Sequence, residues 1–236
     1  MPFIKPVKVS ALDSKFQKSK INGIRKSIFS PSWPLKSCYK GEWKNDKKEG
    51  KGTDYKKSEK KQKKNPIYLR TKWLYEGEWW HGFRHGYGVL SKVLKNNEIW
   101  KCYAGHWVKG KKEGFGGLWY TDGSYYEGIF CQNNRHGFGR MWYGTGDFYQ
   151  GMWKRDLHHG DGMLVQGNGN RYEGQFLSGK KHGQGIYYHL DSGQMQEGFW
   201  NDNICVLSTM EDFNWRQTSR NSTFYSIPEV GKKMSN

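Results

Sequence analysis

The amino-acid sequence predicts an all-β protein, an elongated single-layer antiparallel sheet of tandem β-hairpin repeats. Three observations point to this fold class. An aromatic-x-Gly-x-aromatic motif recurs along the chain and settles to a spacing of 23 residues. A Gly-x-Gly motif begins nine residues after its central glycine in every complete copy. Gly, Asn or Asp stands between the two motifs, and these residues suit the positive φ of tight hairpin turns.

The amino-acid composition narrows the possible classes of protein. Leu, Ile, Val and Phe account for 42 of the 236 residues, whereas Trp and Tyr contribute 27. So few aliphatic residues exclude an α/β enzyme with a thick aliphatic core, and the regular recurrence of aromatic residues argues against disorder. No stretch approaches the ~18 consecutive apolar residues of a membrane span, and Met1 to Leu12 lacks the apolar core of a signal peptide. We therefore expect a cytoplasmic protein that is neither secreted nor membrane-spanning.

Six complete repeats and a partial seventh follow one another. The intervals between their first aromatic positions are 36, 28, 23, 23, 23 and 24 residues. The last interval ends at Gln196, where the seventh repeat lacks the usual aromatic residue and the closing Gly-x-Gly. The central glycines of the seven repeats are Gly41, Gly77, Gly105, Gly128, Gly151, Gly174 and Gly198.

The fourth repeat illustrates the expected local structure. Tyr126, Gly128 and Phe130 alternate, so they share one face of an extended strand. Asn133 provides the turn, and the following Gly-x-Gly lets neighbouring rings lie close to the backbone. A second turn, at a glycine three residues before the next repeat, completes a meander. The first turns fall at Asp46, Gly82, Gly110, Asn133, Asp156, Gly179 and Asn203, and the second at Gly123, Gly146, Gly169 and Gly193.

The chain divides into three parts on this basis. Residues 1–36 form a basic N-terminal arm, and residues 37–207 hold the seven repeats. Within the repeats, residues 54–72 are a basic insertion that explains the long first interval, and residues 196–207 form the partial seventh repeat, which we expect to cap the array. Residues 208–236 form an irregular C-terminal tail.

The repeat resembles the MORN repeat (membrane occupation and recognition nexus), with its Tyr-x-Gly-x-Trp, turn and Gly-x-Gly. The resemblance covers about residues 39–207. It implies a non-enzymatic scaffold without a cofactor, since MORN proteins mostly organise other molecules. Some members bind phospholipid surfaces, and others sit in cytoskeletal or axonemal assemblies. Close relatives are associated with sperm formation, cilia and flagella, and the acrosomal vesicle.

The aromatic strip is the first candidate site. Its rings have a structural interpretation, because they can pack on each other and over the glycines of a thin sheet. They also have a functional one, a groove for a protein partner. The sequence leaves both open. The strip consists of Tyr39, Trp43, Tyr75, Trp79, Tyr103, Trp107, Tyr126, Phe130, Tyr149, Trp153, Tyr172, Phe176 and Trp200.

A lysine cluster is the second candidate site. The first 74 residues carry 21 basic and 6 acidic residues, and the rest of the chain carries 18 and 16. Such a cluster suits acidic phospholipid headgroups or acidic proteins, although it is also typical of a solvated insertion. A nucleic-acid partner is disfavoured, because no known nucleic-acid-binding motif accompanies it. The cluster is Lys56, Lys57, Lys60, Lys61, Lys63 and Lys64.

We find no catalytic motif and no metal-ligand spacing. Histidine recurs just before the Gly-x-Gly, but histidines on adjacent hairpins would lie about 10 Å apart, too far to share a metal ion. The dense patch from Asp156 to Asp161 suits turn chemistry better than a metal. The four cysteines are widely spaced, which favours reduced thiols. The histidines are His85, His136, His159 and His182, and the cysteines are Cys38, Cys102, Cys131 and Cys205.

Two functional hypotheses remain. The first is a protein scaffold or adaptor that binds partners through its repeat sheet and arms in a ciliary, flagellar, axonemal or acrosomal-vesicle assembly. The second is a peripheral membrane module that binds acidic phospholipids through the lysine-rich N-terminal third. The sequence makes no prediction of the oligomeric state.

Overall fold

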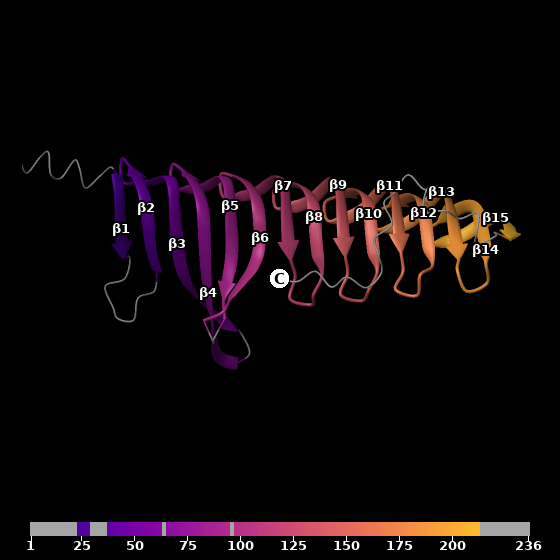
Figure 1. Cartoon of the computed structure of the whole chain (residues 1–236), viewed down its shortest axis with the longest axis horizontal. Helices are drawn as coiled ribbons and strands as arrows, with labels where there is room; N and C mark the ends of the chain where they lie inside the picture. The colour runs from indigo at the N-terminus through magenta and orange to yellow at the C-terminus, as the bar shows by residue number, and fades with distance from the viewer. Residues whose placement is uncertain (1–22, 29–36, 63–64, 95–96, 213–236) are drawn as a thin grey trace, which may run out of the picture. The chain divides into compact units, whose positions relative to one another are not determined.

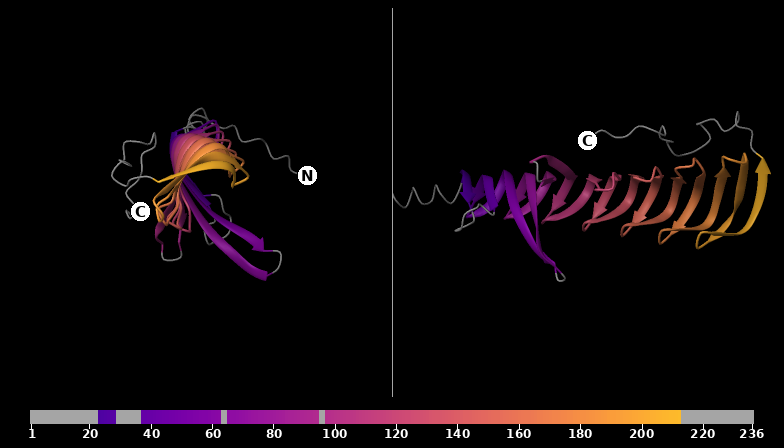
Figure 2. Two further views of the ribbon diagram at one scale, coloured as in Figure 1. Left: turned by 90° about the vertical axis from the view of Figure 1, so that its right-hand side faces the viewer. Right: turned by 90° about the horizontal axis from the view of Figure 1, so that it is seen from below.

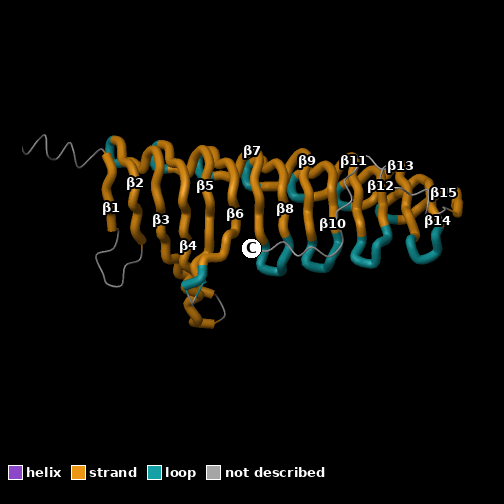
Figure 3. Tube along the Cα trace, in the orientation of Figure 1, coloured by secondary structure: helices purple, strands orange, loops and turns teal. Residues whose placement is uncertain are grey.

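The computed structural model describes residues 23–28, 37–62, 65–94 and 97–212, and β-strand is the regular structure of this part of the chain (Figure 3). The strands are β1 (Gly23–Ile28), β2 (Ser37–Lys44), β3 (Lys47–Gln62), β4 (Asn65–Trp80), β5 (Phe83–Val93), β6 (Ile99–Val108), β7 (Lys111–Trp119), β8 (Tyr125–Cys131), β9 (Asn134–Trp142), β10 (Phe148–Lys154), β11 (Leu157–Val165), β12 (Arg171–Leu177), β13 (Lys180–His189), β14 (Gln194–Asn201) and β15 (Ile204–Asp212).

Strand order in the sheet follows chain order, and every described pairing is antiparallel. The predicted fold class, an all-β antiparallel single sheet of hairpin repeats, is confirmed. The chain forms two compact units. The first comprises Met1–Lys101 with Trp107–Gly110, and the second comprises Cys102–His106 with Lys111–Asn236. Within the second unit, β7 to β15 lie side by side in a single layer (Figure 1).

The turns fall where the sequence places them. Each hairpin of a repeat closes with two residues of positive φ, as in Gln132 (51°) and Asn133 (76°). This is the type I′ geometry, whose twist matches that of the flanking strands. All seven first-turn positions and all four second-turn glycines have positive φ.

The two glycines of Gly-x-Gly have different roles. Gly137 has a φ of 61°, at the point where the register between β8 and β9 shifts. Gly139 instead lies beneath a ring, because a Cβ there would overlap the phenol of Tyr126. The sequence argument gave both glycines the second role, whereas the first glycine is required by its backbone conformation.

Three parts of the chain differ from the sequence expectation. The predicted arm contains a strand, β1, which pairs with β2 from Gly23 opposite Trp43 to Ile28 opposite Cys38. The predicted insertion 54–72 lengthens the β3–β4 hairpin, which extends beyond the neighbouring strands of its unit (Figure 2). The last strand continues past the predicted cap to Asp212. The remainder of the arm and residues 213–236 lie outside the described part of the chain.

The core is mostly aromatic. All thirteen residues of the strip are buried, with exposures from 0% at Tyr39 to 7% at Trp43. The second unit has an additional small cluster of Phe148, Met163 and Val165, against which Trp142 packs. The predicted cap adds little to this core, since Ile204 and Leu207 are 70% and 76% exposed.

Candidate functional site

The aromatic strip forms an interlocked ladder on one face, called here the ring face. In five of the six complete repeats the Tyr ring packs edge-on against the Trp or Phe of its own repeat and of the next, and Tyr103 packs in the same way against Phe130 of the next repeat. Tyr39, for example, lies 5.1 Å from Trp43 and 5.4 Å from Trp79, with interplanar angles of 87° and 82°. Its hydroxyl donates to the backbone carbonyl of Glu42 at 3.1 Å. Burial raises the pKa of Tyr39, so the phenol is neutral at physiological pH.

This burial bears directly on the predicted partner groove. No ring of the strip is more than 7% exposed. A partner could therefore contact these rings only after displacing the side chains that cover them. The ladder is thus positioned to hold neighbouring repeats together.

A basic side chain covers the rings in five repeats, a feature that the sequence analysis missed. In the fourth repeat, the Arg135 guanidinium carbon lies 4.2 Å from the Trp153 ring centre and 5.7 Å from that of Tyr126. The basic residue occurs seven positions after the central glycine, and this fixed offset was the available signal. The five residues are Lys48, Arg84, Lys112, Arg135 and Lys181.

The ring contacts place these cations in an unusual environment. Lys181 lies 4.3 to 5.1 Å from the ring centres of Tyr172, Tyr187 and Trp200. Burial lowers the pKa of Lys181 to about 8, and it also lowers the pKa of Lys48 and of Lys112. Cation–π attraction opposes the loss of hydration, so the positive charges remain on this face.

His158 occupies the same position in the fifth repeat. Its ring stacks on Tyr149 at 3.6 Å with an interplanar angle of 13°. The Nε2 atom lies 2.9 Å from the hydroxyl of Tyr143. Burial, aided by the charge of Arg135, lowers the pKa of His158 to about 3. A neutral ring therefore interrupts the row of cations.

The opposite face, called here the open face, carries the exposed apolar side chains. On the second unit, one row crosses four consecutive strands from β7 to β10. We name it the outer row, and it consists of Phe115 (56% exposed), Ile129 (40%), Phe138 (44%) and Met152 (42%). Phe115 pairs with Ile129 across β7 and β8, and Phe138 pairs with Met152 across β9 and β10. Sequence analysis missed this row, although its members are the residues inside the repeated motifs.

A second row on the same face is aromatic and partly buried. Trp119, Tyr125, Trp142 and Phe148 are cross-strand neighbours, with ring centres 4.9 to 5.5 Å apart. These residues flank the second turns of their repeats. Their apolar character was readable from the sequence, but their alignment required the strand register.

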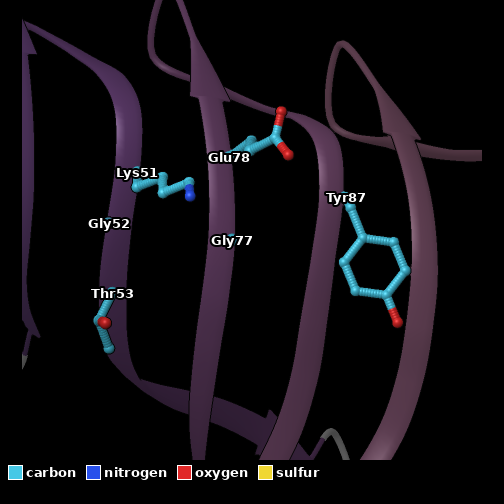
Figure 4. A pocket seen from close by; sticks show the side chains of 6 residues that line it. All are labelled: Lys51, Gly52, Thr53, Gly77, Glu78 and Tyr87. Atoms are coloured by element: carbon cyan, nitrogen blue, oxygen red, sulfur yellow. The ribbon is translucent and has the colours of Figure 1, made fainter.

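On the first unit, the positions that correspond to the outer row carry mostly polar side chains, namely Glu42, Lys51, Glu78 and Tyr87. A depression there is lined by Lys51, Gly52, Thr53, Gly77, Glu78 and Tyr87 (Figure 4). The nearby carboxylates bind the backbone: Glu42 accepts the amide of Lys51 at 3.0 Å, and Glu49 accepts that of His81 at 2.9 Å. These two acidic groups therefore stabilise the turns beside the depression.

The lysine cluster is described in part. Lys56 is exposed, and its ammonium lies 3.8 Å from the buried carboxylate of Asp54, which Lys48 also contacts at 2.6 Å. Lys57, Lys60 and Lys61 lie on β3 in the lengthened hairpin, whereas Lys63 and Lys64 fall outside the described residues.

Groups of three or more His, Cys, Asp or Glu side chains that could hold a metal ion are absent from the described part of the chain. The four cysteines there are free thiols. The described residues include no helix with the length and hydropathy needed to cross a membrane.

The ladder, turns and strand order define a class of protein, a β-hairpin repeat array in which each repeat packs on the next. The chain belongs to the MORN repeat family. The family model matches residues 39–53, 75–92, 103–125, 126–148, 149–171 and 172–191.

The chain is similar to MORN repeat-containing protein 3 of Xenopus laevis, with 49% identity across 98% of this chain and 91% of the relative. The 28-residue second interval followed by intervals of 23, and the flanking sequences Leu12 to Arg25 and Phe224 to Val230, predict a resemblance to this particular member, which the match confirms. The proteins of the same name from Homo sapiens and Macaca fascicularis match at 48% identity over 44 residues, 19% of this chain and 18% of each relative.

Proposed function

We propose that this protein is a non-enzymatic scaffold or adaptor that binds protein partners through its repeat sheet and arms. The observation that carries the proposal is the outer row, four apolar side chains that are 40% to 56% exposed on adjacent strands. A contiguous exposed apolar patch is typical of a protein-binding surface. In this proposal the thirteen strip residues hold the sheet in shape, and the partner contacts the open face.

The proposal includes a cellular setting. We place the scaffold in a sperm or ciliary assembly, either flagellar and axonemal or associated with the acrosomal vesicle, in the cytoplasm. The support is the family resemblance, because MORN repeats are commonly interaction modules. The partners would be cytoskeletal, axonemal or vesicle-associated proteins.

Affinity capture of the tagged full chain from ciliated or testicular tissue tests the proposal. Phe138→Asp should remove the co-purifying proteins that are present in constant ratio, because a charge in the outer row opposes apolar docking. Leu177→Asp is the matched control, since Leu177 is 43% exposed beside a hairpin turn. An identical set of proteins with both variants would contradict the assignment of the binding surface.

A second candidate function is supported by the lengthened hairpin. Its strands have 16 residues each, against seven to eleven in the other strands from β5 to β15, and they carry Lys56, Lys57, Lys60 and Lys61 on β3 and Lys72 on β4. A basic projection of this kind suits an anionic membrane surface, where each lysine contributes about 1 kcal/mol.

Vesicle sedimentation tests this candidate with phosphatidylserine-containing and purely zwitterionic vesicles. Binding to the anionic vesicles should weaken as salt rises, because ions screen surface charges. Replacing all six lysines of the cluster by Gln should abolish it. Binding that survives this replacement would eliminate the lysine cluster as the lipid-binding site.

A further inference from the structure

The open face of the second unit has three parallel rows of side chains. The outer row is apolar. The middle row, continuous in register from β8 to β14, is mixed in character. Glu127 lies opposite Arg140, Glu173 forms an ion pair with Arg171 at 2.8 Å, and Glu197 is exposed. The inner row is the aromatic series that begins at Trp119. This face therefore joins exposed apolar side chains to a mixed row whose exposed carboxylate, Glu197, lies next to β15.

We infer that residues 213–236 of this chain fold back across the open face of the second unit and place Phe224 and Tyr225 on the outer row. Strand β15 ends at Asp212, opposite Gln194 of β14. The chain therefore leaves the sheet at the level of the inner row and continues for 24 further residues. This inference deepens the proposed function. It rests on the proposed function in one respect, because it treats the outer row as a binding surface.

The distances permit this path. Neighbouring strands lie about 4.8 Å apart, so Phe138 on β9 is six spacings, or about 29 Å, from β15. Phe224 follows Asp212 by 12 residues, which span up to about 40 Å when extended. The aromatic pair can thus reach the outer row with length to spare. Trp215, only three residues beyond β15, reaches the neighbouring strands of the same face.

The chemistry of the segment complements the face. It supplies Phe213, Trp215, Phe224 and Tyr225 as apolar anchors. Its four basic residues exceed its single acidic residue, a net charge of +3 that suits the exposed carboxylates of Glu197 on β14 and Glu211 on β15. Attachment to β15 gives the segment an effective concentration of about millimolar at this face, which favours it over a second copy of the chain.

The inference implies that the segment and a protein partner compete for the outer row. In the free chain, the segment would shield apolar side chains that otherwise promote association. A partner must then displace Phe224 and Tyr225 before it binds Phe138. The segment is in this way a regulator of the same surface that the scaffold uses.

Hydrogen exchange by mass spectrometry of the purified full chain tests the inference without a partner. Amides of residues 213–236 should exchange at least tenfold more slowly than in a synthetic peptide of the same sequence. Phe138→Asp should return them to the peptide rate, whereas the matched control Leu177→Asp should leave them slow. A joint Phe224→Ser and Tyr225→Ser variant should also return them to the peptide rate, and it alters no residue of the sheet.

Two results would overturn the inference. The first is exchange at the peptide rate in the full chain while the strands remain protected. The second is protection that disappears on dilution, which would mean that the segment binds a second copy. The partner-capture experiment can fail without affecting either outcome, so the two proposals are separately falsifiable.

Discussion

At the scale of single residues, the turn position connects one repeat to the next. The backbone amide of Asn133 donates to the carbonyl of Lys112 at 3.0 Å, and that of Asp156 donates to Arg135 at 3.1 Å. At Asn133, Asp156 and Asn203 the side chain also accepts a backbone amide from the preceding repeat, as Asn203 does from Lys181 at 2.8 Å. The positive φ and this additional hydrogen bond together explain why Asn or Asp occurs at these turn positions.

Gly139→Ala should destabilise the second unit by about 1–3 kcal/mol, the range of overpacked cores. The added methyl group would overlap the Tyr126 phenol, which is fixed by its hydrogen bond to the carbonyl of Ile129 at 3.0 Å. Denaturant unfolding measures the loss. Gly179→Asn is the control, because Asn is accepted at the equivalent turns and should leave stability unchanged or slightly higher. Equal losses in both variants would contradict the ring-packing role.

His158→Gln should reduce the sensitivity of the fold to acid. Burial lowers the pKa of His158 to about 3 in the folded chain, against about 6.5 when unfolded. Between these values only the unfolded chain takes up this proton, so stability falls as pH drops from about 6.5 towards 3, by at most about 1.4 kcal/mol per pH unit. No such effect operates above pH 6.5.

Thermal midpoints of the parent chain and variants between pH 7 and 4.5 measure this contribution. The exposed His136, changed to Gln, is the control and should retain the full acid slope. Identical slopes for the parent chain and His158→Gln would show that the buried ring remains accessible to protons.

At the scale of elements, the β3–β4 hairpin has two parts, a base that belongs to the sheet and an extension beyond it. At its base it follows the repeat, with Gly52 opposite Gly77. Beyond Lys57 opposite Lys72 it continues as a two-stranded extension, because β2 pairs with β3 only as far as Lys56 and β5 pairs with β4 only as far as Lys72. Isolated two-stranded hairpins are marginally stable in water, so this extension contributes little to the fold.

Replacing residues 57–72 by Asn-Gly should preserve the sheet. Lys56 and Trp73 already face each other, and Asn-Gly favours the type I′ turn that joins such a pair. We expect the thermal midpoint from circular dichroism to change by less than about 5 °C, a shift corresponding to about 1 kcal/mol or less. A collapse of the β-sheet signal would mean that the extension is required for folding.

At the scale of the whole molecule, stability is a sum of neighbour contacts. Each ring contacts its own repeat and the next, and each Trp indole that bridges repeats donates to a glycine carbonyl, as Trp153 does to Gly139 at 3.3 Å. Such arrays lose structure from their ends because an end repeat lacks one neighbour. In the second unit, β15 pairs with β14 alone among the described strands.

Hydrogen exchange should therefore be graded within the second unit. Amides of β14 and β15 should exchange more than about tenfold faster than those of β9 to β11, because opening the end costs fewer contacts. Peptide-resolved mass spectrometry of the full chain measures the gradient. A uniform rate across all these strands would indicate a single cooperative unit and contradict additive stability.

The sequence by itself determined the repeat, its turns and the class of fold. These features are local, since Tyr126, Gly128 and Phe130 alternate along one strand, and Asn133 adopts its turn conformation wherever the strands pair. The set of residues that share the ring face also followed from this alternation, whereas its burial did not. The family followed from the same motif.

Only the tertiary structure decided which side chains meet across strands. Arg135 covers Trp153 of the next repeat, and Phe115 joins Ile129 in the outer row, because strand pairing places residues of different repeats side by side. The shift in register after Gly128 moves these partners away from the positions that simple alternation would give. Cross-strand contacts also determine whether an insertion forms a loop or a pair of strands. The lengthening of β3 and β4 by residues 54–72 was therefore visible only in the structure.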